Sequence, residues 1–188
     1  MRIALFGGSF NPIHNRHIEL AEKVLKDNLA DQVWIVPCGN HAFNKSLAPA
    51  KDRIEMINLS LKGNKNIRVE KYEVERKEKS YAYDTLMALK KINPNDSFMF
   101  IIGSDILGEI ERWHEFEKLK KEAKFIVFHR ADYDIIDKEL DILLVEEGNS
   151  SKLSSTTVRE YTKQGKNIGQ LVPKEVAEYI KTNKLYLK

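Results

Sequence analysis

Hydrophobic positions along the chain follow two alternating patterns. Short apolar runs bounded by polar or glycine residues are typical of strands, and they occur at 2–6, 32–37, 67–75, 97–103, 124–130 and 141–147. Between these runs, apolar residues recur three or four positions apart, which indicates amphipathic helices. The first expected helix begins at Asn15, and the others cover 51–63, 83–92, 116–123, 154–165 and 173–183. Strand and helix therefore alternate along most of the chain.

Two of the expected helices have clear start signals. Asn15 is the expected N-cap of the first helix, because asparagine accepts hydrogen bonds from the free N–H groups of a first helical turn. Ile18, Ala21 and Leu25 then form the apolar stripe of that helix. Pro173 suits the first turn of the last helix, where a missing N–H breaks no hydrogen bond.

This alternation predicts an α/β fold with a doubly wound, mainly parallel sheet and helices on both faces. The 188 residues suit a single domain, 1–188, with a helical C-terminal portion from about 154 to 188. In such sheets, ligands bind beyond the carboxyl ends of the strands. Three segments are expected at that edge: the glycines after the first strand, Gly103 to Asp105, and His129 with Arg130.

The composition narrows the class of protein. Apolar residues make up 42% and charged residues 31% of the chain, as in globular proteins. No apolar run approaches the roughly 18 residues that span a membrane, so no membrane partner is expected. The net charge of +3 is small and lysines are mixed with glutamates, so no nucleic-acid partner is expected. The single cysteine, Cys38, suits a packed thiol in the reducing cytoplasm.

The segment GGSFNPIHNRH, residues 7–17, places two glycines and two histidines, His14 and His17, at a helix start. A zinc site needs three or four ligands, whereas the other histidines, at 41, 114 and 129, are scattered. Helix packing explains one histidine here more readily than two. Backbone N–H groups at a glycine-rich helix start bind phosphate, and histidines there donate further hydrogen bonds. The common nucleotide loops GxGxxG and GxxxxGKS/T are absent, so another phosphate chemistry is indicated.

A second segment, LSSTTVR at 153–159, gathers hydroxyl groups at another helix start. A capping box formed by Thr157 and Glu160 would explain those hydroxyls by itself. Alternatively, the free N–H groups of the first turn bind phosphate together with Arg159, one turn after Thr156. The presence of the first segment in the same chain favours phosphate binding.

These segments carry a family resemblance. GGSFNPIHNRH resembles the HxGH loop of the nucleotidyltransferase superfamily, and LSSTTVR resembles the serine- and threonine-rich segment that completes its active site. The blocks WIVPCG, KDRIEMI, SYAYDTL, FIIGSD, RWHEFEKL and LVPKEVAEYI resemble successive blocks of the bacterial nicotinate-nucleotide adenylyltransferase family, so the resemblance covers nearly the whole chain. Class I aminoacyl-tRNA synthetases share the histidine pair, but no tRNA-binding region is left over here.

The resemblance implies a Rossmann-like nucleotidyltransferase fold that transfers AMP from ATP to nicotinate mononucleotide, releasing pyrophosphate in NAD biosynthesis. It implies three catalytic residues: His14 and His17 on the α- and β-phosphates, and Arg159 on the β- and γ-phosphates. The further ATP contacts that it implies are Gly7, Gly8, Ser9, Phe10, Gly103, Asp105, Ser154, Ser155 and Thr156.

For the mononucleotide, the resemblance implies contacts from Asn40, Lys45, Thr85, Trp113 and Arg130, with Trp113 stacked on the pyridine ring. The partners are therefore ATP and nicotinate mononucleotide. Mg²⁺ would accompany ATP, held mostly by the nucleotide and water and not by a protein cage. The stretch 39–50 is expected to be a mobile loop.

Three departures from the family pattern leave the substrate open. Arg16 stands where the family usually has glycine, the loop GNHAFNKSL replaces a PPHK run, and Ala82 stands where many relatives have threonine. The last two lie where the pyridine substituent would be recognised. An enzyme that accepts or prefers nicotinamide mononucleotide, a pantetheine-phosphate adenylyltransferase or cytidylyltransferase, and a nucleotide-sensing module without turnover stay open as alternatives. A monomer and a homo-oligomer are likewise both open.

Overall fold

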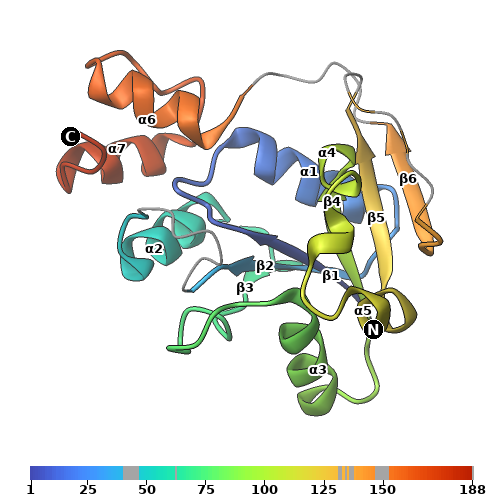
Figure 1. The fold of residues 1–188 in the computed structure, drawn as a ribbon. Coiled ribbons are helices and arrows are strands. Elements are labelled where there is room, and N and C mark those ends of the chain that lie inside the picture. Colours follow the sequence, from blue (N-terminus) through green and yellow to red (C-terminus); the bar gives the residue numbers. More distant parts are fainter. Residues whose placement is uncertain are drawn as a thin grey trace.

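The computed structural model describes residues 1–39, 47–61, 63–130, 133, 135, 138–146 and 153–187. In this part of the chain, six strands form one sheet in the order β3-β2-β1-β4-β5-β6, and every neighbouring pair is parallel (Figure 1). The strands are β1 (Arg2–Gly8), β2 (Gln32–Pro37), β3 (Ile67–Val69), β4 (Ser97–Gly103), β5 (Lys124–His129) and β6 (Ile142–Glu146). The predicted doubly wound parallel sheet is confirmed.

Helices cover both faces of the sheet because side chains on each strand alternate between two apolar faces. Ala4 and Phe6 of β1 belong to one core cluster, and Ile3 and Leu5 belong to the other. The first face is covered by α1 (Asn15–Lys26), α2 (Ala50–Ser60), α6 (Ser155–Lys163) and α7 (Lys174–Thr182). The second is covered by α3 (Ala82–Ile92), α4 (Ser104–Leu107), the 3-10 helix η1 (Ile110–Arg112) and α5 (Phe116–Glu122). Figure 1 shows α6 and α7 together beyond α1 and α2.

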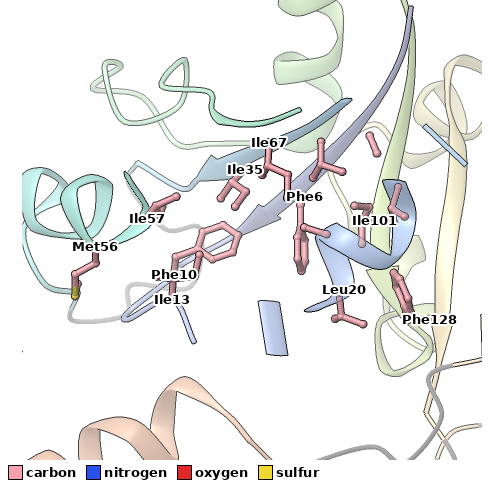
Figure 2. Packing of buried hydrophobic residues seen from close by; sticks show 14 of the residues in the cluster. Phe6, Phe10, Ile13, Leu20, Ile35, Met56, Ile57, Ile67, Ile101 and Phe128 are labelled. Carbon is pink, nitrogen blue, oxygen red and sulfur yellow. The ribbon is translucent and has the colours of Figure 1, made fainter. Parts of the chain in front are cut away.

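The first core cluster reaches the segment that carries the histidines. Phe10 and Ile13, which follow β1, are buried beside Phe6, and Met56 and Ile57 of α2 close the same layer (Figure 2). Burying a side chain of this size contributes roughly 1.5–3 kcal/mol. The segment after β1 is therefore anchored in the core and fixed in position.

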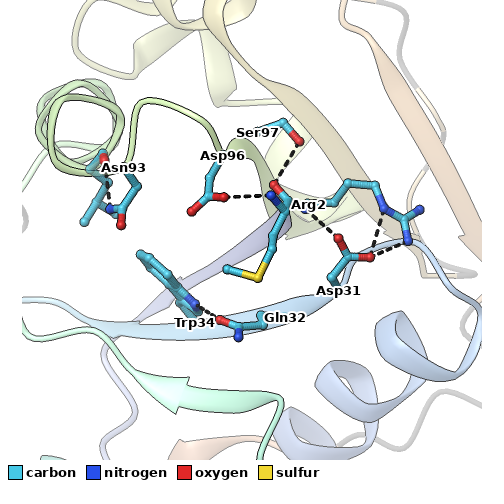
Figure 3. A network of polar contacts seen from close by, with 9 residues as sticks. Arg2, Asp31, Gln32, Trp34, Asn93, Asp96 and Ser97 are labelled. Atoms are coloured by element: carbon cyan, nitrogen blue, oxygen red, sulfur yellow. Dashed lines mark hydrogen bonds and ion pairs between the residues drawn. The ribbon is translucent and has the colours of Figure 1, made fainter.

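The amino ends of β1 and β4 are held by polar contacts (Figure 3). The Arg2 guanidinium donates to the Asp31 carboxylate at 2.6 Å, and the Met1 amino group donates to Asp96 at 2.7 Å. The Arg2–Asp31 pair is more than two-fifths exposed on both sides, and exposed pairs contribute at most about 1 kcal/mol each. These contacts lie at the end of the sheet opposite to the predicted site.

Several expected boundaries differ from the structure: α2 ends at Ser60 and not at 63, and Pro173 is the N-cap of α7 and not part of its first turn. Three further differences have a clear structural reason. The strand expected over 67–75 is wrong beyond Val69: β3 is an edge strand with three pairs to β2, and the chain then turns so that the Glu73 carboxylate accepts a partly buried hydrogen bond from Thr85. Asn15 is not the N-cap of α1 but its first residue, and its side chain donates to the Gln170 carbonyl instead. β1 also extends through both glycines, because they continue the pairing with β2.

The strand order reverses between β1 and β4, which defines the crevice where ligands bind in doubly wound sheets. Gly8 and Gly103 end these two strands. No helix among the described residues is both long and apolar enough to cross a bilayer.

Candidate active site

The chain leaving β1 takes a constrained path at Phe10. This residue has a φ of 44°, a left-handed conformation that is uncommon for a bulky side chain. Its buried ring makes edge contacts to Phe6 and His17, at centroid distances of 5.7 and 5.0 Å, and these contacts hold the conformation. A Cβ at Gly8 would come within 3.1 Å of the same ring. The backbone at Gly8 and Phe10 is thus set by packing against the Phe10 ring.

His14 and His17 are brought into direct contact at the start of α1. Their rings stack with centroids 3.6 Å apart and planes inclined by 19°. The backbone N–H of His14, the N-cap, donates to Nδ1 of His17 at 3.3 Å. In neutral His17, the proton then sits on Nε2, which is a donor toward a ligand. Nδ1 of His14 is buried and has no hydrogen-bond partner in the described part of the chain.

Both histidines are neutral at pH 7. Burial lowers the pKa of His14 to about 4, with smaller contributions from the positive charges of Arg130 and Arg16. Burial also lowers the pKa of His17 well below its usual value, again with contributions from His14 and Arg130. The pair therefore acts through hydrogen-bond donors and acceptors in the ligand-free protein, and a bound polyphosphate would favour its protonation.

This neutrality predicts that the protein loses stability as the pH falls from about 6.5 toward 4. The unfolded chain takes up protons on His14 and His17 in this range, whereas the folded chain does not, so protonation favours unfolding. For His14 alone we expect a loss of about 1–3 kcal/mol in the free energy of unfolding. Urea unfolding of the wild type and of His14→Gln at several pH values measures it. The variant should show a shallower slope, whereas His114→Gln, an exposed histidine outside the pair, should keep the wild-type slope.

The end of β4 holds a second cluster. Asp105 accepts from the Arg130 guanidinium at 2.9 Å, and the Arg130 backbone N–H donates to the Ser104 hydroxyl at 3.0 Å. A Cβ at Gly103 would collide with the Asp105 carboxylate in its present position, so the glycine lets that side chain lie close to the end of β4. The Oδ1 atom of Asp105 is buried and without a hydrogen-bond partner among the described residues. Because the Arg130 charge also lowers the pKa of both histidines, this cluster adjoins the histidine pair.

The segment 153–159 docks against the first motif. Ser155 donates to the Pro12 carbonyl at 2.8 Å, and Arg159 donates to the Asn11 carbonyl at 2.9 Å. A second Arg159 nitrogen donates to the Thr156 hydroxyl at 3.1 Å. Two motifs about 140 residues apart in the chain are thus in direct contact, as one predicted site requires.

The start of α6 differs from the expected capping box of Thr157 and Glu160. Ser154 is the N-cap, and its hydroxyl accepts from the Thr157 N–H at 3.1 Å. The reason is that the helix begins two residues before Thr157, which places Thr157 at the third helical position. The geometry of a helix leaves the N–H groups of Ser155 and Thr156 without intrahelical acceptors, so they suit an anion.

The residues predicted for the mononucleotide are less closely grouped. Thr85 is 2% exposed, and its hydroxyl donates to Glu73 at 2.8 Å; burial raises the pKa of that glutamate. Trp113 is half-buried against the second core cluster, next to the Tyr81–His114 ring contact. Asn40 and Lys45, and most of the expected loop 39–50, lie outside the described residues.

Arg16, the departure within the first motif, forms an ion pair with Glu19 at 3.2 Å. Its positive charge lowers the pKa of His14, so it lies close enough to act on the histidine pair electrostatically.

A metal cage and a reactive thiol place further requirements on the described residues. In the described ranges, no group of three or more His, Cys, Asp or Glu residues could hold a metal ion. Burial raises the pKa of the Cys38 thiol, which therefore stays protonated and unreactive at neutral pH.

Sequence reasoning missed three residues that build the site: Asn11, Arg53 and Glu73. Arg53 carried a signal, because it shares the apolar stripe of α2 with Met56 and Ile57 at helical spacing. A charged residue in such a stripe is buried, and a buried charge needs specific partners.

Comparison with known proteins agrees with this geometry. The family model described as cytidylyltransferase-like matches residues 5–161, and the chain belongs to this family of nucleotidyltransferases. A probable nicotinate-nucleotide adenylyltransferase from Clostridium acetobutylicum is 34% identical, with 98% of each chain covered. The nicotinate-nucleotide adenylyltransferase of Bacillus subtilis is 33% identical, with 98% of each chain covered. Within the family, the chain groups with the nicotinate-nucleotide adenylyltransferases.

Solved structures extend the likeness to the fold. Plasmodium falciparum nicotinic acid mononucleotide adenylyltransferase complexed with NaAD has a TM-score of 0.85 at 27% identity, covering 98% of this chain and 97% of that one. Its complex with APC has a TM-score of 0.83 at 26% identity, covering 98% and 96%.

Proposed function

We propose that this chain transfers the adenylyl group of ATP to nicotinate mononucleotide, giving nicotinate adenine dinucleotide and pyrophosphate. The observation that carries the proposal is a pair of buried, unpartnered polar atoms, Nδ1 of His14 and Oδ1 of Asp105, in adjoining clusters at the strand-order reversal. Buried polar atoms normally have partners, so these two are set to receive them from a ligand. Relatives named for this activity, and a structural neighbour in complex with NaAD, support the same reaction.

In this reaction, a phosphate oxygen of the mononucleotide attacks the α-phosphorus of ATP, and the bond from the α-phosphorus to the bridging oxygen of the β-phosphate breaks. Pyrophosphate leaves with that oxygen, so the protein needs no covalent intermediate. Its contribution is to hold the two reactants in line and to stabilise charge on the transferred group.

Each ATP-side residue has a place in this scheme. The backbone of Gly7, Gly8, Ser9 and Phe10 would line the phosphates. His17 would donate from Nε2 to a non-bridging oxygen of the α-phosphate, and His14 would contact the β-phosphate. The start of α6 and Arg159 would hold the β- and γ-phosphates, with Ser154, Ser155 and Thr156 shaping that helix start. Asp105 would accept from a ribose hydroxyl, with Gly103 allowing the close approach.

On the mononucleotide side, Trp113 would stack on the pyridine ring and Lys45 would reach the phosphate, while Asn40 and Arg130 would make further contacts. Thr85, whose hydroxyl is already bonded to Glu73, would support this side of the site indirectly. ATP would enter as its Mg²⁺ complex, with the ion held by phosphate oxygens and water. The protonated thiol of Cys38 suits the reducing cytoplasm.

Pyrophosphate release with Mg²⁺-ATP tests the function, with nicotinate mononucleotide, nicotinamide mononucleotide and phosphopantetheine as parallel acceptors. We expect kcat/KM for nicotinate mononucleotide to exceed that for nicotinamide mononucleotide by about tenfold or more, or roughly 1.4 kcal/mol at the transition state. Equal values for the two pyridine nucleotides would show that the altered loop and Ala82 do not select the carboxylate. Turnover with phosphopantetheine alone, or no turnover with any of the three acceptors, would overturn the proposal.

A further inference from the structure

Arg53 is a buried cation that the adenylyl-transfer scheme does not use. It lies in the first turns of α2 and is 2% exposed. Among the described residues, no carboxylate lies within ion-pair distance of its guanidinium. A buried charge is unfavourable unless hydrogen bonds compensate for the lost water, so the partners of Arg53 indicate its role.

Those partners are the carbonyl groups of three separate backbone segments. Nε donates to Ala48 at 3.1 Å, Nη1 donates to Ser9 at 2.9 Å, and Nη2 donates to Cys38 at 2.8 Å. Ser9 belongs to the phosphate segment after β1, Cys38 follows the end of β2, and Ala48 precedes α2. One planar side chain therefore joins three segments with all of its guanidinium nitrogens.

Ala48 is also held from its other side. Its N–H donates to Oδ1 of Asn11 at 2.9 Å, and the same oxygen accepts from the Tyr186 hydroxyl at 3.0 Å. The backbone carbonyl of Asn11 in turn accepts from Arg159. Both polar groups of the Ala48 peptide backbone thus lead to the first motif, one through Asn11 and the other through Arg53. We call this closed set of Ser9, Asn11, Cys38, Ala48 and Arg53 the loop clasp.

We propose that Arg53 is a positioning residue that fixes Cys38 and Ala48, the described chain on the predicted mononucleotide side, relative to the predicted ATP-phosphate segment at Ser9 through the loop clasp. Cys38 and Ala48 bracket the stretch of sequence on which Asn40 and Lys45, two predicted mononucleotide contacts, fall. Ser9 belongs to the predicted ATP-phosphate segment. In-line transfer requires reacting atoms about 3–3.5 Å apart, and a displacement of about 1 Å lowers the rate on the order of 10²-fold. This inference rests on the proposed function, because the two reactants that the clasp would align are those of the proposed reaction.

The variant Arg53→Lys tests this role, because it keeps the charge but cannot span three carbonyls with one ammonium group. We expect kcat to fall by about 30- to 100-fold and the KM for the mononucleotide to rise, while the Kd for ATP stays within about threefold of wild type. The control is Asp52→Asn. Asp52 is the preceding residue, is 7% exposed, and accepts at 2.9 Å from Tyr179 of α7, which is not one of the clasp residues.

Comparing the two variants separates an effect on the alignment of the reactants from an effect on the stability of the protein. Asp52→Asn should lower the Tm but leave kcat within about twofold of wild type. If Arg53→Lys lowers the Tm while its kcat also stays near wild type, the residue is structural only and the proposal is wrong. Pyrophosphate release is measured below the Tm of each variant, so that loss of folded protein does not imitate loss of alignment.

Amide hydrogen exchange tests, independently of turnover, whether Arg53 holds the segments of the loop clasp together. In Arg53→Lys we expect the Ala48 amide to exchange at least about tenfold faster than in the wild type, while amides within β4 keep their protection. Unchanged exchange at Ala48 would overturn the clasp even in an active enzyme. If the wild type releases no pyrophosphate with any acceptor, the proposed function fails, and the exchange at Ala48 still shows whether Arg53 holds these segments together.

Discussion

Replacing His17 with alanine is expected to lower kcat by about 10²–10³-fold, with the Kd for ATP within about threefold of wild type. Nδ1 of His17 already accepts from the backbone of His14, so Nε2 is its free donor and is directed by that bond. A neutral donor fixed in a buried site needs no reorganisation when charge develops on the transferred phosphoryl group, which is why its loss affects the transition state more than ATP binding. Pyrophosphate release and calorimetric titration with ATP measure the two quantities.

His17 also packs against Phe10 and His14, so its removal lowers stability as well. The variant His17→Gln addresses this, because glutamine places an amide donor close to the position of Nε2 and should recover part of the lost kcat. His114→Ala removes an exposed imidazole whose ring contacts Tyr81, and its effect on kcat should be small by comparison. An unchanged kcat in folded His17→Ala would rule out the assigned role.

The variant Arg159→Met is expected to lower kcat/KM for ATP by about 10³-fold, mainly through a higher KM for ATP. It removes the cation from the start of α6 and also leaves the Asn11 carbonyl without its Arg159 donor. Since Arg159 bonds both Asn11 and Thr156, the substitution loosens the docking of the second motif on the first. Initial rates at varied ATP and saturating mononucleotide give the KM, and thermal unfolding shows whether the docking is weakened.

Arg68→Met is the matched control for Arg159. Arg68 is also a partly exposed arginine with side-chain contacts, since it stacks 3.6 Å over the Trp34 ring and pairs with Glu70 at 3.6 Å, but it lies on β3 away from the motifs. Its substitution should lower the Tm without changing the KM for ATP. A KM for ATP that rises equally in both variants would mean that the effect of Arg159 is not local to the phosphates.

The histidine pair shows how much of the candidate site could be predicted from residue types alone. Their spacing and the preceding glycines indicated phosphate chemistry, and the second motif, through family resemblance, indicated its companion Arg159. The protonation state of the pair depended on tertiary packing: Phe10 and the neighbouring arginine charges surround the rings, and burial lowers both pKa values. No local pattern encodes that burial.

The N-caps of two helices also differ between what local sequence predicts and what the tertiary structure shows. Asn15 and Thr157 have good intrinsic cap propensity, yet His14 and Ser154 occupy the N-cap positions. Asn15 contacts the carbonyl of Gln170, which is 155 residues further along the chain, so no residue near Asn15 in the sequence predicts this contact. Likewise, the alternating pattern of 67–75 indicated a strand, but the edge position of β3 and the inward turn at Glu73 end it early.

The sequence by itself determined the order of strands and helices, the parallel doubly wound sheet and the positions of the two motifs that we predict to bind phosphate, because hydrophobic periodicity and short-range residue chemistry specify these features directly. Only the tertiary structure decided which distant segments meet. It docked Arg159 on Asn11, set Arg130 beside Asp105, and buried Arg53 among three carbonyl groups. These contacts form between residues far apart in the chain, where the geometry of the folded core, and not local propensity, sets the distances.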